Sequence, residues 1–186
     1  MVWNTHYVKQ DHAFLGASKY HWIKYTDEQL EMAWDAFKAV QEGTAKHEYA
    51  KLAIENRIWQ KESGDTLSMY INDAIGYSMS PEVLLYYSEN CFGTTDAISF
   101  EEEKSLLRIH DLKTGKLKAH MEQLLIYNAL FCLDYNIKPT DIHSELRIYQ
   151  YDDISKYEPP ADEIAHIMSR IITADKIINR KKMKGV

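Results

Sequence analysis

Two short segments, each with the pattern of a β-strand and each carrying an aspartate, constrain the fold of this chain most strongly. They are Gly93–Ser99, which contains Asp96, and Ile109–Gly115, which contains Asp111 and Lys113. Alternate residues of a strand point to the same face of a sheet. We therefore expect the Asp111 carboxylate and the Lys113 ammonium to lie side by side.

The two strands are expected to pair as a hairpin, with Ile98 opposite Ile109 and Phe100 opposite Leu107. The same register sets the two aspartates opposite each other, with Cβ atoms about 5 Å apart, where like charges repel. A divalent metal ion with oxygen ligands would offset that repulsion. Two metal-binding carboxylates beside a lysine are suited to activating water for attack on a phosphodiester.

The composition is that of a soluble protein with one ordinary core. Of 186 residues, 45% are hydrophobic and 27% charged, which is typical of a single globular domain. No apolar run approaches a membrane span and the N-terminus has no export signal, so we expect a cytoplasmic location and no membrane partner. The net charge of −6 argues against a protein that coats nucleic acid non-specifically, although a cleft can still be locally positive.

The two cysteines, Cys91 and Cys132, fit no metal-binding spacing, so reduced thiols are expected. Their number excludes a four-cysteine iron–sulfur cluster built from this chain alone. Hydrophobic periodicity predicts the element order α-β-β-β-α-β-α, with an additional helix break at Gly43. The predicted helices cover residues 26–43, 44–59, 66–77, 117–135 and 161–178, and the predicted strands cover 83–87, 92–100, 105–112 and 145–151.

Four motifs in one order resemble those of RecB-type nucleases of the PD-(D/E)XK superfamily, in the small form often encoded by phages. They are GTxxH at Gly43–His47, GxxD at Gly93–Asp96, DxK at Asp111–Lys113 and QxxxY at Gln123–Tyr127. DxK alone is too common to be informative, whereas the ordered set of four is specific. The segment His12–Ser18 also resembles the openings of such phage proteins.

The resemblance implies an α+β (α/β) fold with a PD-(D/E)XK restriction-endonuclease-like core, in which a central mixed β-sheet is flanked by helices. It implies one nuclease domain over residues 1–186. Within it, residues 1–42 would form an N-terminal helical extension, 43–151 the nuclease core, and 152–186 a C-terminal helix with a basic tail.

The resemblance also assigns roles to the residues of the first three motifs. Asp96 and Asp111 would bind one or two Mg²⁺ or Mn²⁺ ions, together with His47 and the backbone carbonyl of Leu112. An imidazole ligand favours Mn²⁺ over Mg²⁺. Lys113 would orient the attacking water and stabilise charge on the phosphate.

In the fourth motif, Gln123 would support the active site and Tyr127 would contact or position the nucleic-acid strand. Four residues apart, they share one helix face, and Lys116 and His120 would extend that face toward phosphates. The basic end Arg180–Lys184 is expected to be solvated, with a weak phosphate contact as the alternative.

Each assignment has a structural alternative. On helical spacing His47 lies above Ala50 and Ile54, as an ordinary structural histidine would, while Glu48 and Glu55 on the same helix could supplement it as ligands. Two carboxylates on strands can also be merely solvated, and Lys113 alone would be an ordinary strand-end lysine. The segment Thr114-Gly115-Lys116 that follows it is not a P-loop, because the full GxxxxGK[ST] pattern is absent.

The sequence thus predicts a divalent-metal-dependent deoxyribonuclease, an exonuclease acting on DNA ends or single strands in phage DNA processing or recombination, within the host cytoplasm. A homo-oligomer and a recombination or replication protein are the expected partners. One alternative is a structure-specific endonuclease that uses the same residues. Another is a weakly active nuclease-fold protein that binds a host or replication protein, which the acidic surface would suit. An enzyme of small phosphoesters would leave the QxxxY motif without a role.

Overall fold

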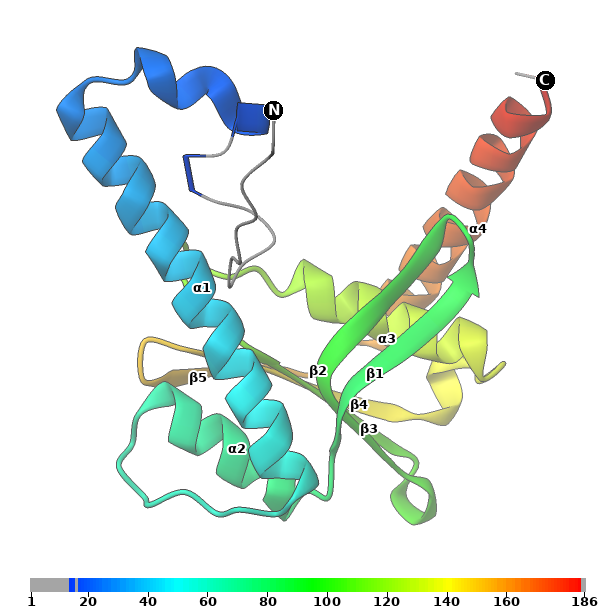
Figure 1. The fold of residues 1–186 in the computed structure, drawn as a ribbon. Coiled ribbons are helices and arrows are strands. Elements are labelled where there is room, and N and C mark those ends of the chain that lie inside the picture. Colours follow the sequence, from blue (N-terminus) through cyan, green and yellow to red (C-terminus); the bar gives the residue numbers. More distant parts are fainter. Residues whose placement is uncertain (1–13, 16, 185–186) are drawn as a thin grey trace, which may run out of the picture. The chain divides into compact units, whose positions relative to one another are not determined.

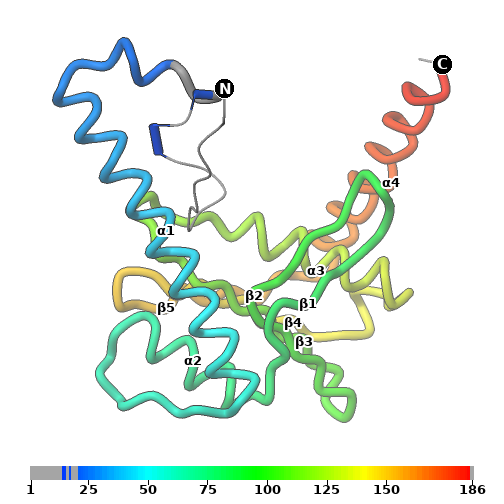
Figure 2. The backbone as a smooth tube through the Cα atoms, viewed as in Figure 1, coloured from blue at the N-terminus to red at the C-terminus, as the bar shows by residue number. Residues whose placement is uncertain are grey.

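The computed structural model describes residues 14, 15 and 17–184, so much of the motif His12–Ser18 lies outside the described residues. The chain divides into two compact units, Met1–Thr44 and Ala45–Val186. The fold is α+β, with a five-stranded mixed sheet flanked by helices (Figures 1 and 2). Among the described residues, no helix combines the length and apolar character needed to cross a membrane.

The first unit contains the 3-10 helix η1 (Ala17–Lys24) and the first part of helix α1 (Asp27–Glu55). Thr26 and Gln29 form a capping box at the start of α1. The Gln29 backbone N–H donates to the Thr26 hydroxyl (3.3 Å), and the Thr26 N–H donates to the Gln29 side chain (3.0 Å). Three aromatic rings of this unit pack against one another: Phe14, Trp34 and Phe37.

Helix α1 is continuous, and the predicted break at Gly43 is wrong. The Thr44 hydroxyl donates to the Val40 carbonyl one turn earlier (3.1 Å), so it is satisfied inside the helix and does not cap a new one. A glycine inside a helix costs only about 1 kcal/mol, which the helical residues on both sides outweigh. The helix ends at Glu55, before the predicted end at residue 59, because Arg57 adopts the left-handed conformation (φ 51°).

The second unit is built on the sheet, whose strand order is β1-β2-β3-β4-β5 with β3 and β4 parallel and all other neighbours antiparallel. The strands are β1 (Ser80–Ser88), β2 (Cys91–Glu101), β3 (Leu106–Leu112), β4 (His143–Gln150) and β5 (Asp153–Tyr157). The helices are α2 (Thr66–Gly76), α3 (Glu122–Asp134) and α4 (Ala161–Lys184), with short 3-10 turns η2 (Glu102–Lys104) and η3 (Pro139–Asp141). The predicted hairpin register is confirmed, since Ile98 pairs with Ile109 and Phe100 with Leu107.

Three further features of the second unit differ from the predicted ones. Helix α3 begins at Glu122 rather than at residue 117. The Gln150 side chain holds the preceding segment in a non-helical path, accepting from the Ala119 N–H and donating to the Gly115 and Leu117 carbonyls. Strand β5 was not predicted, and it follows a two-residue turn in which residues 151 and 152 both have positive φ. Helix α4 runs on to Lys184 and includes the basic end.

Apolar side chains fill both sides of the sheet. Helices α3 and α4 cover one side, in a core that includes Leu85, Ile109 and Leu130. Helix α2 and the last turns of α1 cover the other, in a core that includes Ile54 and Ile71. The sheet is therefore fixed between two layers of helices (Figure 1).

A polar network ties α2 to the sheet directly behind β3. Asp73 on α2 accepts hydrogen bonds from Arg147 (2.7 Å) and from the Tyr149 hydroxyl (2.6 Å) on β4. The Tyr149 oxygen lies 3.1 Å from His110 Nδ1 on β3. Because Tyr149 is fully buried and the Arg147 side chain is 13% exposed, Asp73 satisfies groups that water cannot reach freely.

Replacing Asp73 should therefore destabilise the second unit. Asp73→Ala removes one acceptor from the nearly buried Arg147 guanidinium, which keeps Glu145, and one from the buried Tyr149 hydroxyl. We expect a loss of about 1–3 kcal/mol in the free energy of unfolding. Urea denaturation followed by circular dichroism measures this value. The matched control is Asp141→Ala on η3, where the carboxylate is exposed and accepts from the hydroxyl of neighbouring Thr140. Equal unfolding free energies for the two variants would contradict the role given to Asp73.

Candidate active site

The site is built where the backbone pairing of β2 with β3 ends. The last pair is Ala97 with His110, and the two predicted aspartates come immediately after it. The Leu112 N–H donates to Asp96 Oδ2 (2.8 Å), so a side-chain oxygen takes the place of a backbone acceptor. This hydrogen bond fixes the Asp96 carboxylate against the end of β3.

Asp111 is a carboxylate held almost out of water. Its side chain is 3% exposed, and the Lys113 ammonium both donates to Oδ1 (3.0 Å) and lies 2.9 Å from Oδ2. Among the described residues, Oδ2 accepts no hydrogen bond of good geometry. Burial, followed by the negative charge of Asp96, raises the pKa of Asp111. The site therefore has room for more positive charge than Lys113 alone supplies.

Lys113 is oriented by a chain of hydrogen bonds that reaches α3. Its ammonium donates to Gln123 Oε1 (2.9 Å), and Gln123 Nε2 in turn donates to the Tyr127 hydroxyl (3.2 Å). The two α3 residues lie one turn apart, as predicted. Gln123 therefore orients Lys113 directly, and Tyr127 does so through Gln123.

Close packing explains why a glycine occupies the first position of the GxxD motif. The Tyr127 ring lies so close to Gly93 that a Cβ there would be 2.8 Å from Tyr127 Cε1. The GxxD, DxK and QxxxY motifs are thus connected by direct contacts.

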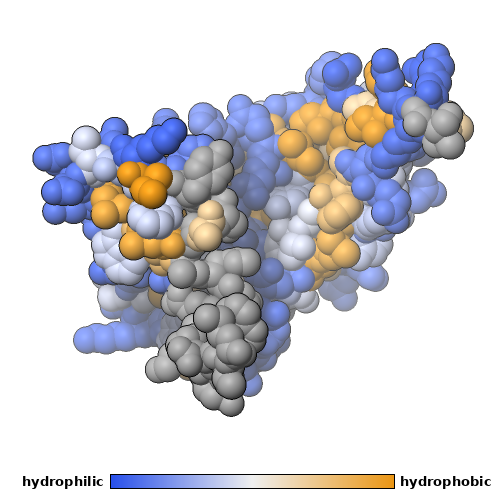
Figure 3. Space-filling view, turned by 45° about the horizontal axis from the view of Figure 1, so that its top comes forward, coloured by the Kyte–Doolittle hydropathy of each residue, from blue (hydrophilic) through white to orange (hydrophobic). Residues whose placement is uncertain are grey.

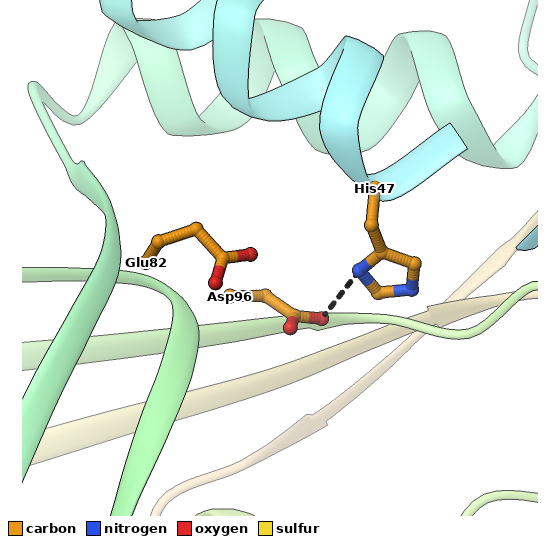
Figure 4. Close-up of side chains that lie close together, drawn as sticks. All are labelled: His47, Glu82 and Asp96. Carbon is orange, nitrogen blue, oxygen red and sulfur yellow. Dashed lines mark ion pairs between the residues drawn. The ribbon is translucent and has the colours of Figure 1, made fainter. Parts of the chain in front are cut away.

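His47 and Asp96 are brought together, and a third residue joins them that the sequence did not indicate. His47 Nδ1 lies 3.5 Å from Asp96 Oδ2, and hydrogen bonding to that carboxylate raises the pKa of His47. Glu82, on the edge strand β1, completes a group whose potential ligand atoms all lie within 4.8 Å of one another. Figure 4 shows the three side chains pointing toward one another from α1, β1 and β2.

Glu82 occupies an unusual backbone position. Its φ of +53° lies in the left-handed region, which non-glycine residues seldom adopt. The flanking residues Pro81 and Val83 pair with Ala97 and Thr95, so Glu82 falls beside Asp96 at a distortion of the edge strand. An isolated glutamate after a proline carries no sequence signal for such a role.

The donor set suits a hard divalent ion with some tolerance for nitrogen. Two carboxylates and an imidazole fit Mn²⁺ or Mg²⁺, and no thiol is present among the three. Asp111, also predicted as a ligand, is not one of these three residues. Its carboxylate binds the Lys113 ammonium, and the charges of Asp96 and His47 act on its pKa. Its role as a metal ligand stays a prediction. The backbone N–H of Leu112 serves Asp96, and the ligand role of its carbonyl stays a prediction.

Other predicted residues lie elsewhere. Lys116 and His120 precede α3 and do not extend its face, so that prediction is wrong; the His120 side chain is 80% exposed. Among the described residues, neither Glu48 nor Glu55 belongs to the group of possible metal ligands. Comparisons of the chain with protein-family models, with curated proteins and with solved structures find no match.

The contact between residues 93 and 127 yields a test. Gly93→Ala should cost about 1–3 kcal/mol of folding free energy, because the added methyl forces the Tyr127 ring away. The control is Gly115→Ala, where a Cβ meets nothing within 4 Å. Combining Gly93→Ala with Tyr127→Val should recover part of the loss, because the smaller side chain makes room. Chemical denaturation of the wild type, of Tyr127→Val alone and of these three variants checks this, and strictly additive losses would contradict the contact.

Proposed function

We propose that this protein is a divalent-metal-dependent deoxyribonuclease whose active site is of the RecB type in the PD-(D/E)XK superfamily. The observation that carries the proposal is the arrangement of Asp111, Lys113 and Gln123. A nearly buried carboxylate and a side-chain amide hold the Lys113 ammonium, and its charge acts on His47, which lies 3.5 Å from Asp96. Residues of all four sequence motifs meet in this arrangement.

A metal ion fits the acidic side of the site. His47, Glu82 and Asp96 would hold it, with Asp111 Oδ2 as a further oxygen that lacks a hydrogen-bond donor among the described residues. When bound, Mg²⁺ or Mn²⁺ would supply Lewis acidity to the phosphate and lower the pKa of a water molecule. Two neighbouring carboxylates, one of them buried, would gain most from such a charge.

Lys113 would act on the substrate directly. An ammonium group has three donors, and hydrogen bonds to Asp111 and Gln123 occupy two of them. The third can donate to a water molecule or to a non-bridging phosphate oxygen, where negative charge grows during hydrolysis. Tyr127 and Gln123 would hold the ammonium in position rather than react themselves.

A cavity beside the site supports a polyanionic substrate. It has a volume of about 410 Å³, and its lining includes Lys46, Lys113 and Lys116 together with residues 114 and 115. Two acids also line it, but both cap the start of α2: Asp65 accepts from the Ser68 N–H and Asp152 from the Thr66 N–H. The cavity therefore offers lysine charge locally although the whole chain is acidic.

The resemblance favours DNA and an exonuclease mode in phage DNA processing or recombination. The same residues would serve a structure-specific endonuclease, and the two modes differ in whether cleavage needs an end. A closed-circular substrate separates them, because an exonuclease leaves it intact.

The central test is digestion of end-labelled linear and closed-circular DNA with Mg²⁺, with Mn²⁺ or with EDTA. Linear DNA should be degraded with either metal and remain intact in EDTA. Lys113→Ala should slow degradation by roughly 100- to 1000-fold, the usual effect of losing one transition-state donor, and Asp96→Asn should act similarly.

Lys138→Ala is the control, because Lys138 is exposed and lies before η3, outside the site. It should degrade DNA like the wild type. Equal cleavage by the wild type and Lys113→Ala would point to a contaminating enzyme. A folded wild type that cleaves neither substrate with either metal would overturn the proposal.

A further inference from the structure

The β1–β2 hairpin has one covered face and one bare face. On the covered face Leu85 and Thr95 are fully buried, and Gly93 contacts Tyr127 of α3. On the bare face Leu84 is 54% exposed and Phe92 58% exposed. Figure 1 shows the hairpin extending from the sheet alongside α4, and Figure 3 shows apolar surface over the part of the molecule that carries these elements.

The bare face of the hairpin begins at the candidate metal ligands Glu82 and Asp96 and extends along both strands. Side chains along a strand alternate between faces, and exposure alternates along β1 at residues 82, 84 and 86. Leu84 pairs with Thr94 and Tyr86 pairs with Phe92 across the hairpin, while Glu82 lies beside Asp96. Three cross-strand pairs therefore follow one another, which we call the hairpin track: 82/96, 84/94 and 86/92.

The far end of the hairpin track is an aromatic pair. The Tyr86 and Phe92 rings are nearly parallel, with an interplanar angle of 21° and centroids 6.1 Å apart. Cross-strand aromatic pairs stabilise hairpins, but that role does not require both rings to stay as exposed as these are, 41% and 58%. An exposed flat aromatic surface is a good platform for a nucleic-acid base.

We propose that the hairpin track binds a single strand of nucleic acid, with bases stacked on Tyr86 and Phe92 while a phosphate of the same strand lies at Asp96. This inference rests on the proposed nuclease function. Asp96 lies four residue steps along β2 from Phe92, a distance of about 13 Å. That length corresponds to roughly four stacked nucleotides at about 3.4 Å each.

The chemistry of the track favours a base over other occupants. No lysine or arginine belongs to its three pairs, so the contact it offers is to a base face rather than to a phosphate. A protein partner would also use exposed aromatic rings, but it would give no reason for the track to begin at the candidate metal ligands. Stacking is tolerant of sequence, which suits an enzyme that degrades DNA of any sequence.

The test is fluorescence anisotropy with two labelled 20-nucleotide strands, one of thymidine and one wholly abasic with the same phosphates. Ca²⁺ replaces Mg²⁺, and electrophoresis checks that the strands stay intact. Phe92→Ala should weaken binding of the thymidine strand by about 5- to 150-fold, the range for losing one base stack. It should leave binding of the abasic strand unchanged.

Two matched variants distinguish the effect of an aromatic ring at position 92 from that of an apolar side chain without a ring. Phe92→Tyr should bind the thymidine strand nearly as the wild type does, whereas Phe92→Leu should resemble Phe92→Ala. Ile126→Ala removes an apolar side chain of similar exposure (43%) on α3 and should have no effect. Circular dichroism confirms that each variant is folded.

Three results would overturn the inference. Unchanged binding by Phe92→Ala would exclude stacking, and an equal loss for both strands would mean that the ring only supports the hairpin. Retained binding by Phe92→Leu would indicate a general apolar contact. If the wild type degrades linear DNA with Mg²⁺ while any of these is observed, the proposed function stands and only the track fails. A wild type that neither binds nor cleaves DNA would remove both.

Discussion

The electrostatic repulsion between Asp96 and Asp111 is the constraint around which the second unit is organised. Asp111 is almost fully buried, and the charge of Asp96 adds to the cost of ionising it. A chain that only needed stability would gain from removing one carboxylate, because buried charges seldom repay their desolvation. Lys113 compensates one negative charge, and the remaining negative charge is the reason for proposing a divalent ion here.

The surrounding structure holds this strained arrangement in place from several directions. The backbone of β3 fixes Asp96 through the Leu112 N–H, and α3 fixes Lys113 through Gln123. Tyr127 then packs on Gly93 of β2, which couples the helix back to the strand that carries Asp96. Because each contact involves a different element, the site depends on the packing of α3 on the sheet rather than on any one loop.

Much of this arrangement could be predicted from local patterns, and the failures have identifiable physical causes. The expected β2–β3 register set apolar residues of the two strands opposite each other, and the structure does pair Ile98 with Ile109. The predicted helix break at Gly43 was wrong because the helical residues on both sides outweigh the weak tendency of glycine to interrupt a helix. The predicted start of α3 was wrong because Gln150, distant in sequence, forms hydrogen bonds that keep the preceding segment out of the helix. Glu82 reaches the site through a distortion of the edge strand, which no spacing rule encodes.

We propose above all that His47, Asp96 and their acidic neighbours form a divalent-metal centre. Crystals of the protein soaked in Mn²⁺, with diffraction recorded near the manganese absorption edge, test it most directly. We expect an anomalous peak within bonding distance of an Asp96 oxygen and of His47 or Glu82, and none at that position in crystals of Asp96→Asn. Mn²⁺ peaks found only away from these residues, or no peak at Asp96 at saturating Mn²⁺, would contradict the account.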